Sequence, residues 1–133
     1  MPQNKVREFH IATKQPINDT LTLPSDEILN LRHKLIQEEV DELKEAIDSN
    51  DIVEIADALG DILYHLYAFG VMTGISLNEV FDEIHKSNMT KITPDGQVLL
   101  REDGKIIKPC SYNPCANIMV FLAVNPSLLA AAC

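Results

Sequence analysis

The sequence predicts an all-α protein: a helical bundle of four to five helices, completed by oligomerisation and followed by a short C-terminal hairpin or loop. Apolar residues recur at helical spacing through residues 28–47, and residues 51–72 are too apolar for a surface helix. Capping and turn residues separate these segments. A chain of 133 residues buries only a modest core, so we expect an oligomer to complete it.

The first element is a short helix over residues 6–12, and an irregular stretch containing Pro16 and Pro24 follows it. Ser25 stands where a helix N-cap is expected, and the second helix runs from there to about Asp48. Its leucines and isoleucines recur on one side, which predicts a helix that packs against a neighbour.

Ser49, Asn50 and Asp51 are turn and N-cap residues that connect the second helix to a third, over residues 51–72. Asp51 followed by Glu54 resembles a capping box. A reversal of the chain at this point makes the second and third helices an antiparallel hairpin. The third helix is apolar nearly all round, which predicts a central place in the bundle.

Gly74 ends the third helix, and Ser76 opens a capping box for a fourth helix that runs to about Asn88. Beyond it, turn sequences at residues 94–96 and 102–104 enclose short apolar runs. This pattern predicts a small hairpin or an ordered loop.

Two acidic clusters lie on the hairpin where core residues are expected. At about 100° per residue, Glu39 and Glu42 fall at the centre of the apolar stripe of the second helix, and Glu38 flanks it. The third helix carries one acidic stripe on an otherwise apolar surface. Its members are Glu54, Asp57 and Asp61.

A reversal near residues 49–50 places residues equally distant from the turn at the same height. The facing pairs are Glu42 with Asp57, Glu45 with Glu54 and Glu39 with Asp61. Carboxylates this close raise one another's pKa, and a divalent cation relieves that conflict. Oxygen ligands without Cys or a nearby Glu-x-x-His pair suit Mg²⁺, with Mn²⁺ as a substitute. The alternative is that the acidic runs are solvated helix faces.

The composition bounds the partners and the compartment. The net charge of −9 argues against nucleic acid or an anionic membrane as a partner. The N-terminus has no apolar signal region, so we expect a cytoplasmic protein. Free thiols are expected at the three cysteines, Cys110, Cys115 and Cys133. An uncharged tail, residues 116–133, is interrupted by Asn125-Pro126 and makes a poor membrane helix.

Cations gather after the fourth helix. They are Lys91, Arg101, Lys105 and Lys108. In an otherwise acidic domain such a group suits phosphate binding. The alternative is that they are scattered, solvated side chains.

The order Glu38-Glu39-x-x-Glu42, an 11-residue gap, then Glu54-x-x-Asp57 resembles the signature of the MazG-like all-α nucleoside triphosphate pyrophosphohydrolases. That group also includes phosphoribosyl-ATP pyrophosphohydrolases and dimeric dUTPases. Further similar segments are Val6-x-x-Phe9-His10, Ser87 to Lys91, and Asp103 to Lys108 with Tyr112. The resemblance covers residues 6–114, and the chain departs from it after Pro109. It implies a pyrophosphohydrolase domain over residues 1–115, with residues 116–133 as a tail of no assigned role.

The resemblance also implies roles for individual residues. The metal ligands would be Glu39, Glu42, Glu54 and Asp57. Glu38 would be the catalytic residue, binding a further ion or orienting water, and Asp61 would support the ligands or hold an extra ion. The nucleotide- and phosphate-binding residues would be Phe9, His10, Asn88, Lys91, Lys105, Lys108 and Tyr112. Against this, Phe9 is typical of a core, His10 of a surface, and Tyr112 of simple packing.

Together these features imply an Mg²⁺-dependent hydrolase that cleaves a nucleoside triphosphate between the α and β phosphates, releasing the monophosphate and pyrophosphate. The expected role is removal of non-canonical or surplus nucleotides, and a biosynthetic substrate such as phosphoribosyl-ATP remains open. We expect a homodimer or homotetramer. The alternative from another class is a non-catalytic helical dimer module that metal stabilises.

Overall fold

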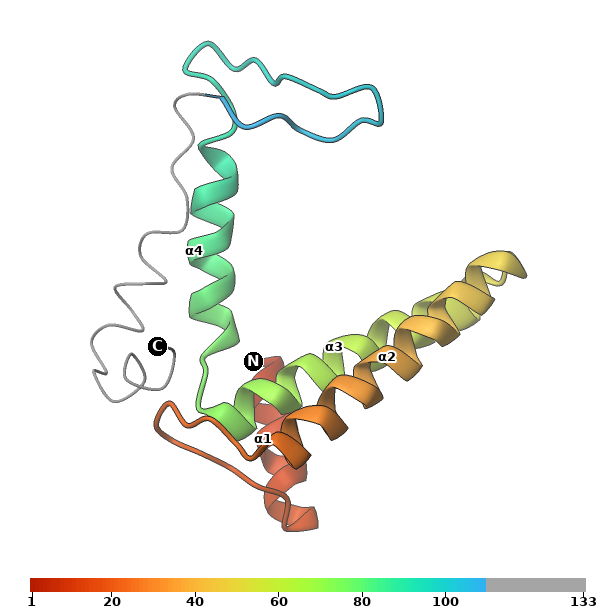
Figure 1. Cartoon of the computed structure of the whole chain (residues 1–133), viewed down its shortest axis with the longest axis vertical. Coiled ribbons are helices and arrows are strands. Elements are labelled where there is room, and N and C mark those ends of the chain that lie inside the picture. The colour runs from red at the N-terminus through yellow and green to blue at the C-terminus, as the bar shows by residue number, and fades with distance from the viewer. Residues whose placement is uncertain (110–133) are drawn as a thin grey trace. The chain divides into compact units, whose positions relative to one another are not determined.

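The computed structural model describes residues 1–109 and has four helices in that range (Figure 1). They are α1 (Pro2–Thr13), α2 (Asp26–Asp48), α3 (Ile52–Thr73) and α4 (Leu77–Met89). No strand occurs among the described residues, which confirms the all-α prediction. The chain divides into two compact units, residues 1–76 and a second that begins at Leu77. Tyr112, the three cysteines and the tail over residues 116–133 lie outside the described range.

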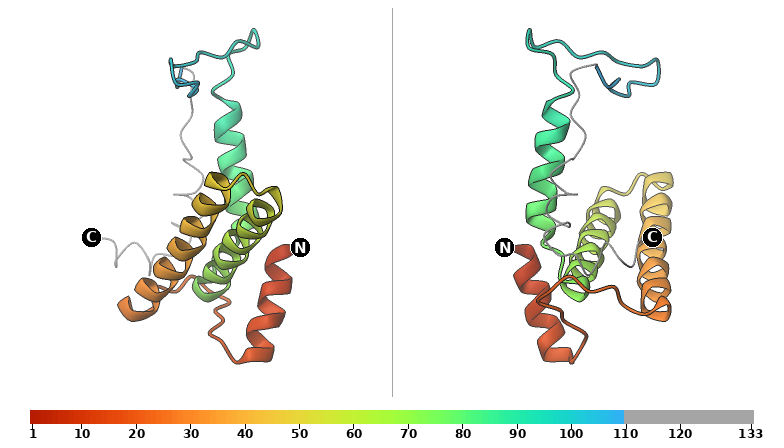
Figure 2. Two further views of the ribbon diagram at one scale, coloured as in Figure 1. Left: turned by 90° about the vertical axis from the view of Figure 1, so that its right-hand side faces the viewer. Right: turned by 60° about the vertical axis from the view of Figure 1, so that its left-hand side comes forward.

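The predicted hairpin is present, because α2 and α3 lie side by side in every view (Figure 2). Asp51 caps α3: its Oδ1 accepts hydrogen bonds from the backbone N–H groups of Val53 at 2.9 Å and Glu54 at 3.2 Å. Ser25 occupies the N-cap of α2 with an extended backbone, but its side chain makes no capping hydrogen bond. The predicted boundary is therefore right, and the predicted cap contributes only its backbone carbonyl, which accepts from Leu29 at 3.0 Å.

The first helix is longer than the prediction. It begins at Pro2, four residues before the apolar residue Val6 that marks the start of the periodic pattern. Proline has a fixed φ and lacks an N–H, so it suits the first turn of a helix. Val6 is 2% exposed and forms a small core with Ala68 and Val71 of α3.

The segment between α1 and α2 binds the C-terminal end of α3. Asn18 donates its backbone N–H to the carbonyl of Val71 at 3.0 Å and its Nδ2 to that of Met72 at 2.6 Å. The backbone N–H of Thr22 donates to the carbonyl of Thr73 at 2.9 Å. These carbonyls have no partner within the helix, so the segment supplies what the helix end lacks.

The unit that begins at Leu77 consists of α4 and an ordered loop. Leu100 and Ile106 form an isolated antiparallel bridge, and the backbone N–H of Ile107 donates to the carbonyl of Leu99 at 2.7 Å. Both turns use glycine with positive φ, Gly96 and Gly104. A single isolated bridge without strands among the described residues corresponds to the ordered-loop alternative of the prediction, not to a regular hairpin.

One side of the α2–α3 hairpin is apolar and exposed. Buried Ala46 and Ala58 mark where the two helices face each other. At about 100° per residue, the exposed apolar residues are turned about 80–140° from these alanines, in the same sense on both helices. In an antiparallel pair that rotation brings them to one side of the hairpin. The exposed residues of this apolar side are Val40, Ile47, Ile52, Leu59, Leu63 and Leu66.

No single helix within residues 1–109 is long and apolar enough to cross a membrane.

Candidate functional site

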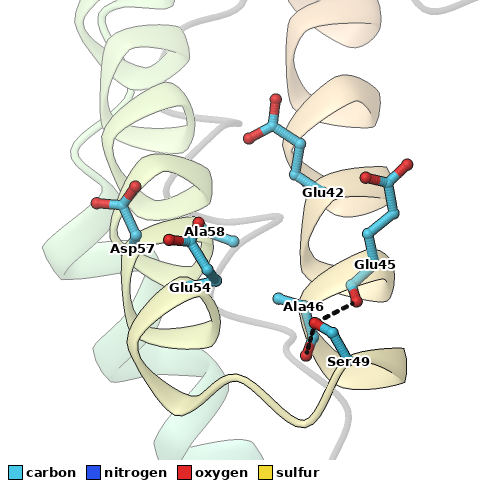
Figure 3. Close-up of a pocket in the computed structure, with 7 residues that line it drawn as sticks. All are labelled: Glu42, Glu45, Ala46, Ser49, Glu54, Asp57 and Ala58. Atoms are coloured by element: carbon cyan, nitrogen blue, oxygen red, sulfur yellow. Dashed lines mark hydrogen bonds between the residues drawn. The ribbon is translucent and has the colours of Figure 1, made fainter.

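The α2–α3 hairpin is acidic on the side opposite its apolar side, and acidic residues there border a cavity beside the turn (Figure 3). The cavity has a volume of about 470 Å³ and is lined by Glu42, Glu45, Ala46, Ser49, Glu54, Asp57 and Ala58. Two carboxylates come from the last turns of α2 and two from the first turns of α3. The reversal at residues 49–50 therefore brings together the two predicted pairs nearest the turn, Glu42 with Asp57 and Glu45 with Glu54.

The local sequence explains the shape of this end. Ser49 Oγ donates to the carbonyl of Glu45 at 3.0 Å and to that of Ala46 at 3.1 Å, closing the end of α2. Asn50 adopts a positive φ of 53°, which Asn tolerates better than most residues. Asp51 then starts α3, so the two acidic segments follow each other with a short turn between them.

The carboxylates differ in direction and in burial. Glu42 points from α2 into the space between the helices, whereas the carboxyl group of Glu45 points away from α3 (Figure 3). Glu42, Glu54 and Asp57 are exposed, contrary to the expectation of a core-facing layer. Within residues 1–76, no third helix covers α2 and α3 on this side, so these carboxylates stay in contact with solvent.

Glu39 lies apart from the cavity lining and is partly buried between α2 and α3. Its Oε1 lies 3.4 Å from Nε2 of His65, and 17% and 24% of the two side chains are exposed. The expected partner was Asp61, at equal height along the hairpin. Side chains tilt toward the N-terminus of their own helix, so Glu39 leans away from the turn and His65 leans toward it. The two therefore meet although their backbones are offset.

The remaining acidic candidates are exposed. Glu38 lies 3.8 Å from Nζ of Lys34, one turn earlier on α2. Asp61 is exposed on α3 and does not line the cavity. Their side chains are free to reorient, since neither is buried.

The donor set suits a hard divalent cation. Carboxylate oxygens from both helices border one cavity, and Oε2 of Glu39 is a buried oxygen without a hydrogen-bond partner among residues 1–109. In the same part of the chain, no three His, Cys, Asp or Glu side chains are grouped closely enough to hold a metal ion. Coordination would therefore need the exposed carboxylates to turn inward. The assignment of Glu39, Glu42, Glu54 and Asp57 as ligands stays a prediction.

The two nucleotide-site candidates on α1 differ in burial. His10 is 1% exposed, and its Nδ1 lies 3.0 Å from the carbonyl oxygen of Pro16. Because a carbonyl only accepts, Nδ1 carries the proton. Phe9 is 46% exposed and packs edge-on against Tyr64, with ring centroids 5.9 Å apart. Neither residue lines the acidic cavity, and their role in a nucleotide site stays a prediction. Their burial is the reverse of the alternative in which Phe9 belongs to a core and His10 to the surface.

The phosphate-site candidates lie in the second unit. Nζ of Lys91 donates to Oδ1 of Asn88 at 2.6 Å, which links two candidates on adjoining turns. The guanidinium of Arg101 binds the carboxylate of Asp103 through two nitrogens, and this contact lowers the pKa of Asp103. Lys105 and Lys108 are exposed. Arg101 is therefore held by its own loop, whereas the two lysines are accessible from solvent.

Two residues near the site do not belong to the site residues that the sequence predicts. Glu45 was expected only as a partner of Glu54, and the structure places it in the cavity lining. The second is His65, for which the sequence patterns predict no role. A polar residue that interrupts the most apolar part of α3 was the available signal for it.

Comparison with known proteins agrees with the resemblance of the acidic motifs to a pyrophosphohydrolase family. The model of a family described as phosphoribosyl-ATP pyrophosphohydrolase matches residues 6–88. An uncharacterized protein of Acanthamoeba polyphaga mimivirus is 41% identical over 95 residues. The aligned part is 71% of this chain and 32% of that protein, so the chain spans about a third of its relative. The matched residues include all the predicted acidic ligands and end before the cations Lys91, Arg101, Lys105 and Lys108.

Proposed function

Because this chain belongs to the phosphoribosyl-ATP pyrophosphohydrolase family, we propose that it hydrolyses a nucleoside triphosphate between the α and β phosphates. Water adds to phosphorus, the phosphorus–oxygen bond to the leaving group breaks, and the products are a nucleoside monophosphate and pyrophosphate. The observation that carries the proposal is the acidic cavity to which α2 and α3, both inside the matched region, contribute. Removal of non-canonical or surplus nucleotides is the biological role we propose.

The carboxylates supply the binding site for Mg²⁺, or for Mn²⁺ in its place. We assign Glu42, Glu54 and Asp57 at the cavity, with Glu39 beside them, as the ligands. A bound divalent ion neutralises phosphate charge and lowers the pKa of water at the reaction centre. The acidic side chains could not bind a polyphosphate without it, because like charges repel.

Glu38 is the residue we assign to orienting the attacking water. It lies on the same side of α2 as Glu42 and is exposed, so it can approach a substrate that occupies the cavity. Positioning of water and phosphate accounts for most of the expected rate enhancement, since the reaction needs little covalent chemistry from the protein.

We further propose that the protein works as a homodimer or homotetramer. The apolar side of the hairpin has the heptad-like spacing of Leu59, Leu63 and Leu66 on α3, and it lies opposite the acidic cavity. A second copy covering this side would complete a four-helix bundle and leave the cavity open to substrate.

The test is an assay of pyrophosphate release over a panel of nucleoside triphosphates and phosphoribosyl-ATP, with and without Mg²⁺. Turnover that requires Mg²⁺ and yields pyrophosphate with a monophosphate supports the proposal. Release of single phosphates instead of pyrophosphate would contradict the site of cleavage. Metal binding without turnover on any member of the panel would favour the non-catalytic dimer module.

A further inference from the structure

The contact between Glu39 and His65 leaves two buried atoms without partners. These are Oε2 of Glu39 and Nδ1 of His65, neither of which has a hydrogen bond within residues 1–109. An ionised carboxylate oxygen only accepts, so the tautomer with the proton on Nε2 suits this contact. Nδ1 is then left as an acceptor without a donor in the described part of the chain, which proteins tolerate better than a buried N–H without an acceptor. Nε2 is the nitrogen that faces Glu39 Oε1 at 3.4 Å.

The two carboxylate oxygens of Glu39 have different surroundings. Oε1 faces the N–H of His65, while Oε2 is buried and unsatisfied. An unsatisfied carboxylate oxygen is costly inside a protein unless a cation or donor binds it. Glu39 also lies one helical turn before Glu42, whose side chain points into the space between the helices.

We infer that His65 is a positioning residue for the metal site: it holds Oε1 of Glu39 so that Oε2 is presented to the cation. This inference rests on the proposed function. Carboxylate ligands are commonly held by a hydrogen bond to their second oxygen, and such a bond fixes the rotamer before the metal binds. His65 projects from the side of α3 that faces α2, where no other described residue lies within ion-pair distance of Glu39.

The experiment is calorimetric titration of Mn²⁺ into the full chain without nucleotide. His65→Phe and His65→Leu both remove the donor but differ in volume, so a folding defect in one does not decide the result. We expect each to weaken Mn²⁺ binding by about 10- to 100-fold. His65→Gln keeps an N–H donor and should recover most of the affinity. His33→Leu, at an exposed position on α2, is the matched control and should bind as the wild type does.

A double substitution separates positioning from packing. In a Glu39→Gln background, His65→Phe should cause no further loss of Mn²⁺ affinity, because His65 acts through Glu39. An equal, additive loss in that background would overturn the inference. So would wild-type Mn²⁺ affinity in both His65→Phe and His65→Leu, a result that leaves the proposed function standing. If the wild type shows no saturable Mn²⁺ binding, the proposed metal-dependent function fails, and the inference fails with it.

Discussion

Replacing Gly74 with alanine should destabilise the fold strongly, whereas the same replacement at Gly60 should stabilise it. Gly74 ends α3 with a φ of +70°, a left-handed backbone that costs other residues about 1–2 kcal/mol. A Cβ at this position would stand 2.5 Å from the carbonyl carbon of Thr20 and closer still to its oxygen. Both are backbone atoms, so the segment between α1 and α2 has to move.

The size of the effect follows from what this segment holds. Asn18 and Thr22 donate three hydrogen bonds to the last carbonyls of α3, and each contributes about 1 kcal/mol. If the segment detaches, these bonds and the left-handed penalty add up to a loss of about 4–5 kcal/mol. Gly60 lies inside α3, and a Cβ there meets no atom within 4 Å. Gly60→Ala should therefore gain about 0.8–1 kcal/mol of helix propensity.

Urea unfolding followed by circular dichroism measures both changes, at one protein concentration because association shifts the apparent stability. Gly74→Asn serves as a further control, since asparagine tolerates the left-handed backbone but carries the same Cβ. It should recover only the strain and remain well below the wild type. A free energy of unfolding for Gly74→Ala within about 0.5 kcal/mol of the wild type would refute the close contact with Thr20.

Four further outcomes are expected. Glu42→Gln and Asp57→Asn should each abolish turnover with helix content intact, and activity above about a tenth of wild type in both would argue against the site. Millimolar Mg²⁺ or Mn²⁺ should raise the melting temperature more than NaCl at matched ionic strength, and the combination of those two substitutions should remove the difference. Leu63→Lys places a charge on the apolar side of the hairpin and should convert a dimer to a monomer in sedimentation. A wild type that is already monomeric at micromolar concentration would contradict this expectation. Asp51→Ala should cost about 1 kcal/mol of unfolding free energy, whereas Ser25→Ala, whose side chain makes no cap, should be nearly neutral; equal losses would contradict the capping geometry.

Local chemistry explains why the helix boundaries were predictable. Asp51 and Gly74 act on their own neighbours, through a side-chain cap and a left-handed terminus, so their effect can be derived without the rest of the fold. The predicted start of α1 is too late, because the apolar periodicity begins at Val6 whereas the helix begins at Pro2, which suits a first turn. Ser25 shows the limit of this approach, since a residue of the right type need not form the bond.

The acidic cavity was predictable in part for the same reason. The reversal at residues 49–50 fixes which carboxylates stand at equal height close to the turn, and Glu42 and Asp57 follow that rule. Further from the turn, the tilt of the side chains and the packing of neighbours decide the contacts. Glu39 therefore meets His65 instead of Asp61. The burial of His10 depends on the path of the chain near Pro16, which periodicity does not encode.

The bonds between the α1–α2 segment and the end of α3 also impose an order on folding. Asn18 contacts Met72 across 54 residues of chain, whereas α2 and α3 pair across a short turn. Closing the long loop loses more chain entropy, so the hairpin can form first and α1 joins it later. During synthesis, α1 leaves the ribosome long before the carbonyls of Val71 and Met72 exist. The N-terminal segment must wait with Val6 uncovered, and it is therefore the part of this domain that a chaperone would meet first.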